Sequence, residues 1–218
     1  MKAVSIKDIA NRAGVSTTTV SFVLNGKAKE KRISNDLKDQ ILAIAAELNY
    51  RPNHVARGLR TGKTNTIGLM VEDISNPFFA NLAKIIEDEA DKVGYTVMFC
   101  STENNDQRAG SLLHMLKHRQ MDGFIITPTI GLERDVKQIV DEKRPLVLLD
   151  RYFPELDSDY VTIDNYKGSN DATKWLLERG CQKIGIVTLQ SDLVQMSNRA
   201  NGYFDALKDA GFQPEQEL

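Results

Sequence analysis

Apolar residues in the first 50 positions recur every three or four residues, which predicts three short amphipathic helices. Ser5 can cap the first helix, with Asp8 as its capping-box partner. Gly14 ends that helix, because glycine tolerates the positive φ of a tight turn, and Ser16 can cap the second helix. The third helix is expected over residues 34–48. The inner faces of the three helices are expected to hold Ile6, Ile9, Ala10, Ala13, Val20, Val23, Leu24, Leu37, Ile41, Ile44, Ala45 and Leu48.

Two short helices about one sharp turn have the geometry of a helix-turn-helix. Such a motif places the first residues of its second helix against base edges in the major groove of DNA. The outer face of the second helix therefore holds the candidate base-reading residues, which are Thr17, Thr18, Ser21 and Phe22. A compact helical hairpin with a glycine turn is the alternative interpretation, since short motifs of this kind also arise by chance.

The charge of the chain is unevenly distributed. The 218 residues carry a formal net charge of -2, yet residues 1–64 hold 12 Lys and Arg against 5 Asp and Glu, whereas residues 65–218 hold 16 against 25. A basic head on an acidic body indicates that the head meets a polyanion, because bound Lys and Arg displace the counterions condensed on phosphates. The basic run Lys27–Arg32 lies beside the helix pair, although such a run alone is more often just a solvated surface.

A short polar segment follows the third helix. Tyr50–Asn53 breaks the helix, and Asn53 can cap the segment His54–Arg60. With seven residues and an internal Gly58, a helix here would be marginal on its own. We expect residues 51–65 to be a linker that is ordered only under some conditions.

Beyond residue 65, short apolar runs alternate with amphipathic helices. The first three runs begin about 28 residues apart, as repeated βαβ units require. We therefore expect an all-α head followed by an α/β body with a doubly wound, mostly parallel sheet and helices on both sides; the length allows two domains. Strands are predicted at Thr66–Val71, Tyr95–Cys100, Gly123–Thr127, Leu146–Leu149, Tyr160–Ile163 and Ile184–Thr188.

The loops at the carboxyl ends of these strands are candidates for a ligand site, because sheets of this type bind ligands there. They collect carboxylates, an arginine and aromatic rings, a mixture that binds small polar molecules such as sugars or nucleobases. Each residue also has a structural alternative: Asp73 or Ser75 can cap the following helix, and Phe78 can pack in the core. The candidate residues in these loops are Asp73, Ser75, Phe78, Thr127, Asp150 and Arg151.

Signatures of enzymes and metal sites are missing from the sequence. The segment Gly58–Thr64 is one residue short of a phosphate-binding loop and precedes a strand instead of following one. His114 and His118 have i,i+4 spacing but lack the glutamate of a zinc-protease motif. We expect a protein that is not an enzyme and has no cofactor and no metal.

The remaining sequence signals concern compartment and redox state. No apolar signal core begins the chain, and no apolar run approaches the roughly 20 residues of a membrane span, so we expect a cytoplasmic protein. Cys100 and Cys181 do not make a disulfide framework. Each adjoins a predicted strand, where a small buried thiol is the ordinary interpretation.

Four segments, in this order along the chain, resemble the LacI/GalR family of bacterial transcription regulators. The resemblance covers essentially the whole chain and implies a head, a hinge helix and a two-lobed body like a periplasmic sugar-binding protein. It implies a repressor that binds palindromic operator DNA as a homodimer and is controlled by a small effector, a sugar or related metabolite. A sugar-binding module with no role on DNA is the alternative, which the basic head and the lack of an export signal disfavour. The segments are Ile9–Ser21, Glu47–Asn53, Ile67-Gly-Leu through Ser75-Asn-Pro-Phe-Phe79, and Asp122–Ile126.

The same resemblance assigns roles to individual residues. Thr17 and Thr18 match base-reading positions, and Ser16 and Asn25 match contacts to the DNA backbone. Leu59 matches a hinge leucine that wedges between base pairs in the minor groove. The expected DNA-contacting residues are Ser5, Ser16, Thr17, Thr18, Ser21, Phe22, Asn25, Asn53, Val55, Ala56 and Leu59. With Arg199, which matches a cleft position, the expected effector-contacting residues are Asp73, Ser75, Phe78, Thr127, Asp150, Arg151 and Arg199.

Two departures from the family pattern affect these expectations. Phe22 stands where many members have an arginine, and it cannot form the paired hydrogen bonds that arginine gives to guanine, though its ring could touch a thymine methyl. The family continues for roughly another third of its length, so we expect most of the second lobe to be missing, either in a fragment or in a truncated regulator. The expected domains are a DNA-binding head at 1–50, the hinge helix and linker at 51–65, the first lobe at 66–164 and the start of the second lobe at 165–218.

Overall fold

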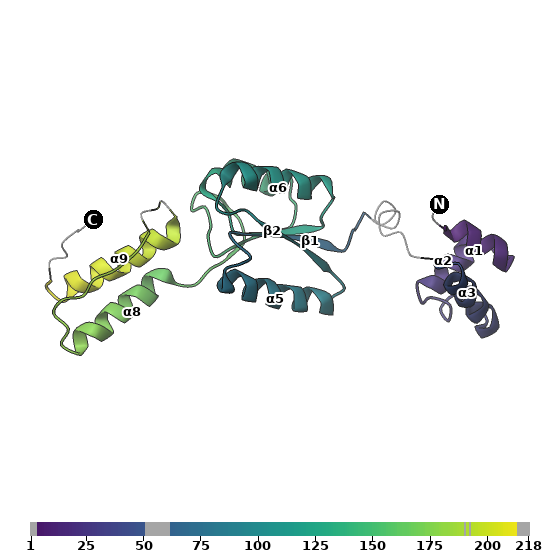
Figure 1. Ribbon diagram of the computed structural model, residues 1–218, viewed down its shortest axis with the longest axis horizontal. Coiled ribbons are helices and arrows are strands. Elements are labelled where there is room, and N and C mark those ends of the chain that lie inside the picture. Colours follow the sequence, from purple (N-terminus) through teal and green to yellow (C-terminus); the bar gives the residue numbers. More distant parts are fainter. Residues whose placement is uncertain (1–3, 51–61, 190, 192, 213–218) are drawn as a thin grey trace. The chain divides into compact units, whose positions relative to one another are not determined.

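The computed structural model describes residues 4–50, 62–189, 191 and 193–212, which fall into two compact units. The first unit spans Met1–Arg57 and the second spans Gly58–Leu218. Each unit has a hydrophobic core of its own (Figure 1).

The first unit is a bundle of three short helices whose ends are set by the expected capping residues. Its helices are α1 (Ile6–Ala13), α2 (Thr17–Leu24) and α3 (Asn35–Glu47). The backbone N–H of Ser5 donates to Asp8 Oδ2 at 2.8 Å, as expected of a capping box. Gly14 ends α1 with a φ of 67°, and the Ser16 hydroxyl accepts a hydrogen bond from the backbone N–H of Thr19 at 3.1 Å. The chain therefore turns sharply between α1 and α2, as a helix-turn-helix requires.

A small buried core holds these three helices together. Ile9 of α1, Val20 of α2 and Ile41 of α3 are completely excluded from solvent. An isolated helix of eight residues is unstable in water, so α1 and α2 depend on this packing for their stability. Ala10, Val23, Ala28 and Ala45 complete the buried cluster.

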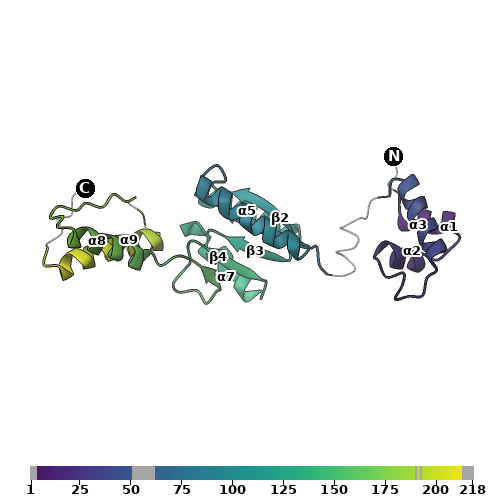
Figure 2. The same ribbon diagram turned by 90° about the horizontal axis from the view of Figure 1, so that it is seen from below.

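The second unit is built on a parallel sheet with helices on both faces. The strands pair in the order β2-β1-β3-β4-β5, and every described pairing is parallel, which confirms the expected doubly wound arrangement. One face is covered by α5, and the opposite face is covered by α6 and α7 (Figures 1 and 2). The elements are β1 (Thr66–Val71), α5 (Pro77–Lys92), β2 (Thr96–Ser101), α6 (Asp106–His118), β3 (Gly123–Ile126), the 3₁₀ turn η1 (Ile130–Leu132), α7 (Glu133–Asp141), β4 (Leu146–Leu149) and β5 (Tyr160–Val161).

The body ends in a pair of packed helices, α8 (Asn165–Glu178) and α9 (Val194–Asp209), which lie side by side (Figures 1 and 2). Their close approach depends on Gly202 of α9. A Cβ atom on this residue would lie 2.2 Å from the carbonyl oxygen of Tyr166 in α8. The Gly202 carbonyl in turn accepts a hydrogen bond of 3.0 Å from the buried amide of Asn170.

The expected strand at Ile184–Thr188 was wrong, because the structure has no regular element at these residues. A strand needs a neighbour that completes its backbone hydrogen bonds, and no described segment pairs with this one. Its Ile184 carbonyl instead accepts a hydrogen bond of 2.7 Å from the Tyr203 hydroxyl of α9. The strand expected at Tyr160–Ile163 is also shorter, since β5 ends at Val161.

Other differences from the expected elements are smaller. The second and third strands differ from the expected bounds by one residue, as is usual at element ends. Cys181 was expected to be buried, but it is exposed. Cys100 in β2 is partly buried, and this burial raises the pKa of its thiol. Among the described helices, none is long and apolar enough to cross a membrane.

We predict that Gly202→Ala loosens the α8–α9 pair, because the added methyl group cannot occupy the space taken by the Tyr166 carbonyl. Overpacking of this kind costs about 1–3 kcal/mol. Amide hydrogen exchange measured by mass spectrometry should be faster in peptides from α8 and α9. Gly168→Ala in α8 is the matched control, since its Cβ would meet no atom within 4 Å, and alanine in a helix is favoured by about 0.5–1 kcal/mol. Equal exchange rates in Gly202→Ala and the unaltered protein would contradict the packing argument.

Candidate functional site: a nucleic-acid interface and a ligand cleft

The exposed face of α2 carries two threonines with free hydroxyl groups. Thr17 and Thr18 are exposed, and neither side chain forms a hydrogen bond with another described residue. They occupy the first two positions of α2, directly after the capping residue Ser16. A helix-turn-helix uses this part of its second helix to meet base edges, so both hydroxyls are available for that role.

The other polar side chains among the expected contacts of the head already have internal hydrogen bonds. The Ser16 hydroxyl caps α2, and the Ser5 hydroxyl is bonded to Asp8. The Asn25 amide group donates to the carbonyl of Ser21 at 2.7 Å and lies 3.3 Å from its hydroxyl. These side chains therefore fix the ends of α1 and α2, which determines where the threonines stand.

The half-buried ring of Phe22 has a charged neighbour that was not anticipated from the sequence. The Lys31 Nζ atom lies 5.4 Å from the centroid of this ring, which is cation–π distance. Lys31 also forms an exposed ion pair with Glu30 at 2.8 Å, and this contact lowers the pKa of the Glu30 carboxyl. The basic run Lys27–Arg32 therefore lies beside α2.

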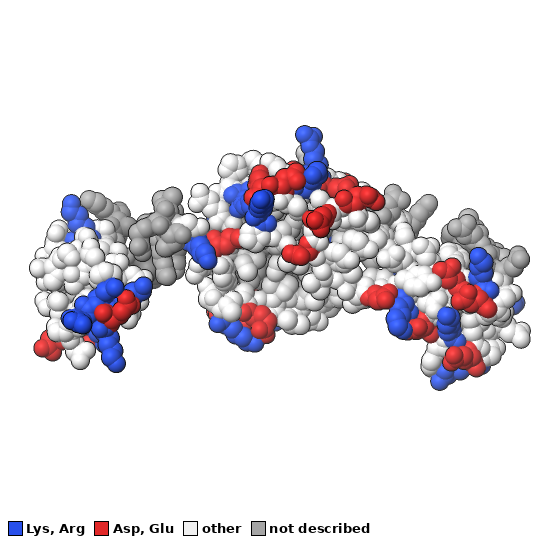
Figure 3. Space-filling model, turned by 180° about the vertical axis from the view of Figure 1, so that it is seen from behind, with Lys and Arg blue, Asp and Glu red and all other residues white. Residues whose placement is uncertain are grey.

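The charge of the head depends on more than this basic run. On the face shown in Figure 3, basic side chains of the head gather with carboxylates among them, and carboxylates gather along one side of the body. Residues 51–65 contain four Lys and Arg and no Asp or Glu, so this segment contributes much of the positive charge counted above. Four expected DNA contacts fall on this segment and lie outside the described residues: Asn53, Val55, Ala56 and Leu59.

In the body, the expected ligand residues follow the carboxyl ends of three neighbouring strands. Asp73 lies after β1, Thr127 follows β3, and Asp150 and Arg151 follow β4. Because these strands are adjacent and parallel, their ends meet at one edge of the sheet. The sheet therefore brings these residues together from distant parts of the sequence.

Arg151 joins three of the strand-end segments. Its side chain is buried, and its guanidinium group pairs with Glu72 after β1 and donates a hydrogen bond of 3.0 Å to Asn104 after β2. Asp150 Oδ2 lies 3.7 Å from Arg151 Nε. These contacts occupy much of the guanidinium group, so Arg151 serves here as a clamp between strand ends.

The two aspartates of this edge are in opposite electrostatic environments. Burial raises the pKa of the Asp150 carboxyl, although the charge of Arg199 acts in the opposite direction. Arg199 is held by a hydrogen bond of 2.7 Å from its Nε to Asn165 Oδ1. By contrast, hydrogen bonds from the hydroxyl and the backbone N–H of Ser75, both of 2.8 Å, lower the pKa of Asp73.

The aromatic pair after β1 divides between core and surface. Both residues lie at the start of α5. Phe79 is buried in the core, whereas Phe78 is 50% exposed. The two rings meet edge to face with centroids 5.0 Å apart. Phe78 therefore presents an aromatic surface to solvent and does not pack in the core, which was the structural alternative for it.

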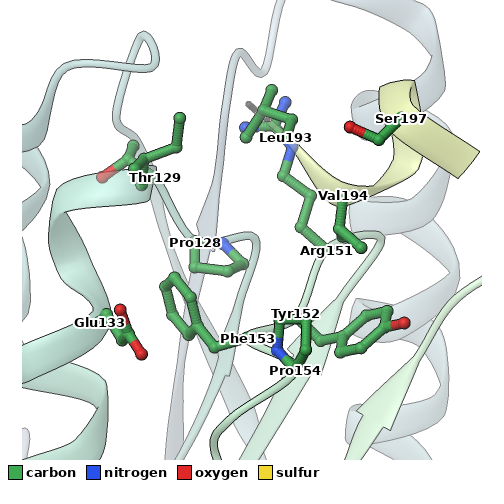
Figure 4. A pocket seen from close by; sticks show the side chains of 11 residues that line it. Pro128, Thr129, Glu133, Arg151, Tyr152, Phe153, Pro154, Leu193, Val194 and Ser197 are labelled. Atoms are coloured by element: carbon green, nitrogen blue, oxygen red, sulfur yellow. The ribbon is translucent and has the colours of Figure 1, made fainter. Parts of the chain in front are cut away.

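A cavity of about 310 Å³ opens beside this edge. Among the expected ligand residues, Arg151 lines it, whereas the others do not. The hydroxyl groups of Thr127 and Thr129 near this edge are buried and lack a hydrogen-bond partner among the described residues. Five further lining residues belong to the strand-end loops in which the ligand was expected: Pro128, Thr129, Ile130, Tyr152 and Phe153. The rest of the lining, shown in Figure 4, was not anticipated from the sequence: Glu133, Pro154, Leu193, Val194 and Ser197.

Comparison with protein families matches both units of the chain. Residues 5–53 match the family described as "Bacterial regulatory proteins, lacI family". Residues 64–218 match "Periplasmic binding proteins and sugar binding domain of LacI family". The chain belongs to the LacI family.

Individual LacI-family proteins are similar over nearly the whole chain. The Ribose operon repressor of Haemophilus influenzae is 36% identical over 207 residues, which cover 94% of this chain and 61% of the relative. The HTH-type transcriptional regulator DegA of Bacillus subtilis is 33% identical over 217 residues, which cover 98% of this chain and 64% of the relative. The chain thus spans less than two thirds of the length of these relatives.

Solved structures show the same fold. The Lac repressor dimer bound to operator and the anti-inducer ONPF superposes with a TM-score of 0.84 at 24% identity, over 98% of this chain and 64% of that one. The transcriptional regulator CelR in complex with cellobiose gives a TM-score of 0.60 at 26% identity, over 97% of this chain and 63% of that one. The helical head and the parallel sheet therefore each have the fold found in LacI-family proteins.

We predict that Asp150→Asn and Asp73→Asn change stability in opposite directions at neutral pH. A raised pKa means that folding disfavours the ionised Asp150; this penalty is fully present above the folded-state pKa and disappears as the pH falls below the ordinary Asp pKa of about 4. A lowered pKa means that folding favours the ionised Asp73, and this contribution is lost as the pH falls through the folded-state pKa. Denaturant unfolding at pH 7 and pH 3 should show a stabilised Asp150→Asn, a destabilised Asp73→Asn and smaller differences in acid.

Asp150 has a φ of 66°, a conformation that asparagine also tolerates. A gain in stability from Asp150→Asn that persists in acid therefore arises from the backbone. A loss of stability in Asp150→Asn at pH 7 would refute the burial argument.

Proposed function

We propose that this chain is a sequence-specific DNA-binding transcription regulator that acts as a repressor under the control of a small effector. The observation that carries the proposal is the pair of exposed hydroxyls of Thr17 and Thr18, at the start of the second helix of a helix-turn-helix, which bond to no described residue. Membership of the LacI family over both units supports the same function. The proposed regulator is not an enzyme and acts on the chromosome, in the nucleoid.

The proposed regulator binds DNA as a homodimer. Two helix-turn-helix heads take adjacent half-sites, about one helical turn apart, so that the operator is nearly palindromic. The Lac repressor neighbour is described as a dimer bound to operator, which supports this arrangement. The proposed domains are the head at 1–50, the hinge and linker at 51–65, the first lobe at 66–164 and the start of a second lobe at 165–218.

The proposed hinge reads the minor groove. Leu59 wedges between base pairs and kinks the duplex, while Val55 and Ala56 face the partner hinge or the groove floor. Asn53 begins this segment. The positive charge of residues 51–65 supports a place beside phosphates.

The proposed effector is a sugar or a related small metabolite that binds at the edge formed by Asp73, Thr127 and Asp150. Support comes from the polar and aromatic groups at this edge and from the adjacent cavity of about 310 Å³. Ser75, Phe78, Arg151 and Arg199 are the further proposed contacts. The effector shifts the dimer between two states that differ in hinge pairing, and the size of the shift is set by its difference in affinity for them.

Binding to a pool of random duplex oligonucleotides tests the proposal directly. The purified chain should enrich a near-palindromic sequence, and its affinity should fall steeply with salt because phosphate contacts release counterions. A sugar-binding module with no role on DNA would enrich nothing and show no salt-sensitive affinity. That result would reject the proposed function.

We predict that Thr18→Ala alters base preference at one position of each half-site. The variant removes an exposed hydroxyl from the base-reading end of α2 without removing a hydrogen bond that holds the head together. A mismatched base contact changes binding by about 1–3 kcal/mol. Gln40→Ala, at an exposed position of α3, is the control and should leave the enriched sequence unchanged. An unchanged profile for Thr18→Ala would remove Thr18 from the base-reading residues.

We also predict that Leu59→Ala weakens specific binding far more than non-specific binding. A wedging side chain acts only on a kinked site, whereas non-specific affinity comes from phosphate contacts. Competition between the enriched duplex and unrelated DNA measures both affinities. Leu42→Ala is a matched truncation of an exposed leucine in α3 and should change neither. Equal losses of affinity for both kinds of DNA in Leu59→Ala would show that Leu59 does not wedge between base pairs.

A further inference from the structure

The base-reading face of α2 includes an aromatic ring that has no hydrogen-bonding group. Thr18 and Phe22 are four residues apart on this helix, so their side chains share one face. The phenyl ring can touch the methyl group of thymine but cannot recognise the acceptors of guanine. Any hydrogen bond to a base at this place must therefore come from another residue.

Lys31 is placed to supply this hydrogen bond to a base. Its ammonium group lies 5.4 Å from the centroid of the Phe22 ring, although the two residues belong to different segments. Its side chain is 41% exposed, so the ammonium group is accessible to a ligand. The ammonium group has three N–H donors and can keep one contact while it makes another.

The loop that carries Lys31 is fixed to the core and to α2. Its first residue, Lys27, donates its backbone N–H to the carbonyl of Phe22 at 2.9 Å. Ala28 is buried in the core of the head and accepts a hydrogen bond of 2.9 Å from the backbone N–H of Ile33. Lys31 itself donates its backbone N–H to the carbonyl of Lys27 at 3.0 Å. The backbone under Lys31 is thus held against the end of α2.

Lys31 differs from the other cations of the same loop. Among the described residues, Lys27, Lys29 and Arg32 form neither an ion pair nor a contact with an aromatic ring. Lys31 contacts both Phe22 and Glu30. The adjacent carboxylate would repel phosphates, which makes this ammonium group less suited than its neighbours to a backbone contact.

We propose, on the basis of the function proposed above, that Lys31 is a specificity-determining residue that donates to the O6 and N7 acceptors of a guanine in the major groove. Phe22 acts as its apolar support and holds the ammonium group beside Thr18 on the reading face. Lys31 thereby replaces, from a neighbouring loop, the donor that an arginine at position 22 would provide. Lysine is suited to this role because guanine presents two acceptors side by side.

The test is binding of the full 218-residue chain and its variants to random duplex pools at fixed salt concentration. In Lys31→Gln, preference for guanine at one position of each half-site should fall roughly ten-fold while the other positions keep their profile. Phe22→Leu, which keeps an apolar side chain but removes the ring, should weaken preference at the same position. Lys29→Gln is the matched control from the same loop and should lower affinity uniformly or leave it unchanged.

The outcomes separate the inference from the function on which it rests. If the unaltered chain enriches a sequence and Lys31→Gln enriches the same one with an unchanged guanine preference, Lys31 is not a reader. A uniform loss of affinity in Lys31→Gln, like that of a phosphate contact, also overturns the inference but leaves the proposed function intact. If the unaltered chain enriches nothing, both fail together. Circular dichroism of each variant checks that the head remains folded.

Discussion

The packing of three buried side chains, Ile9, Val20 and Ile41, is the constraint on which the head depends. Helices of eight residues are unstable alone, so α2 exists as a helix because its inner face is buried against α1 and α3. Capping residues then set where it starts, and the start of α2 is where Thr17 and Thr18 stand. The proposed reading face is thus a consequence of the core, and loss of the core would remove it without altering any of the proposed DNA-contacting residues.

In the body, the candidate site depends on the parallel sheet and not on a helical core. Adjacent strands deliver Glu72, Asn104 and Arg151 to one edge, and the buried guanidinium group of Arg151 joins them. A buried charge is tolerated only when it is paired and hydrogen-bonded, so this clamp favours one arrangement of the loops. The neighbouring carboxylates, the cavity and the threonine hydroxyls that lack a partner among the described residues form a polar edge suited to a small polar ligand.

Local signals in the sequence predicted most of the fold, and non-local features were missed. The bounds of β1 and β4 were predicted, as were the caps at Ser5 and Ser16, because alternation and capping depend on near neighbours. The strand expected at Ile184–Thr188 failed because apolar character alone does not supply a pairing partner. The clamp between Arg151 and Glu72 and the contact between Lys31 and Phe22 are products of the folded chain, which no residue pattern displays. The roles expected for individual DNA and effector contacts stay predictions.

The most direct measurement of the central claim is an NMR titration of the full chain with the duplex that binds it best. The account predicts that amide signals of Thr17, Thr18 and Phe22 and of the Lys27–Arg32 loop change at stoichiometric DNA, while those of the core residue Ile41 change little. Changes centred on α3 or on the body, with the start of α2 unaffected, would contradict it.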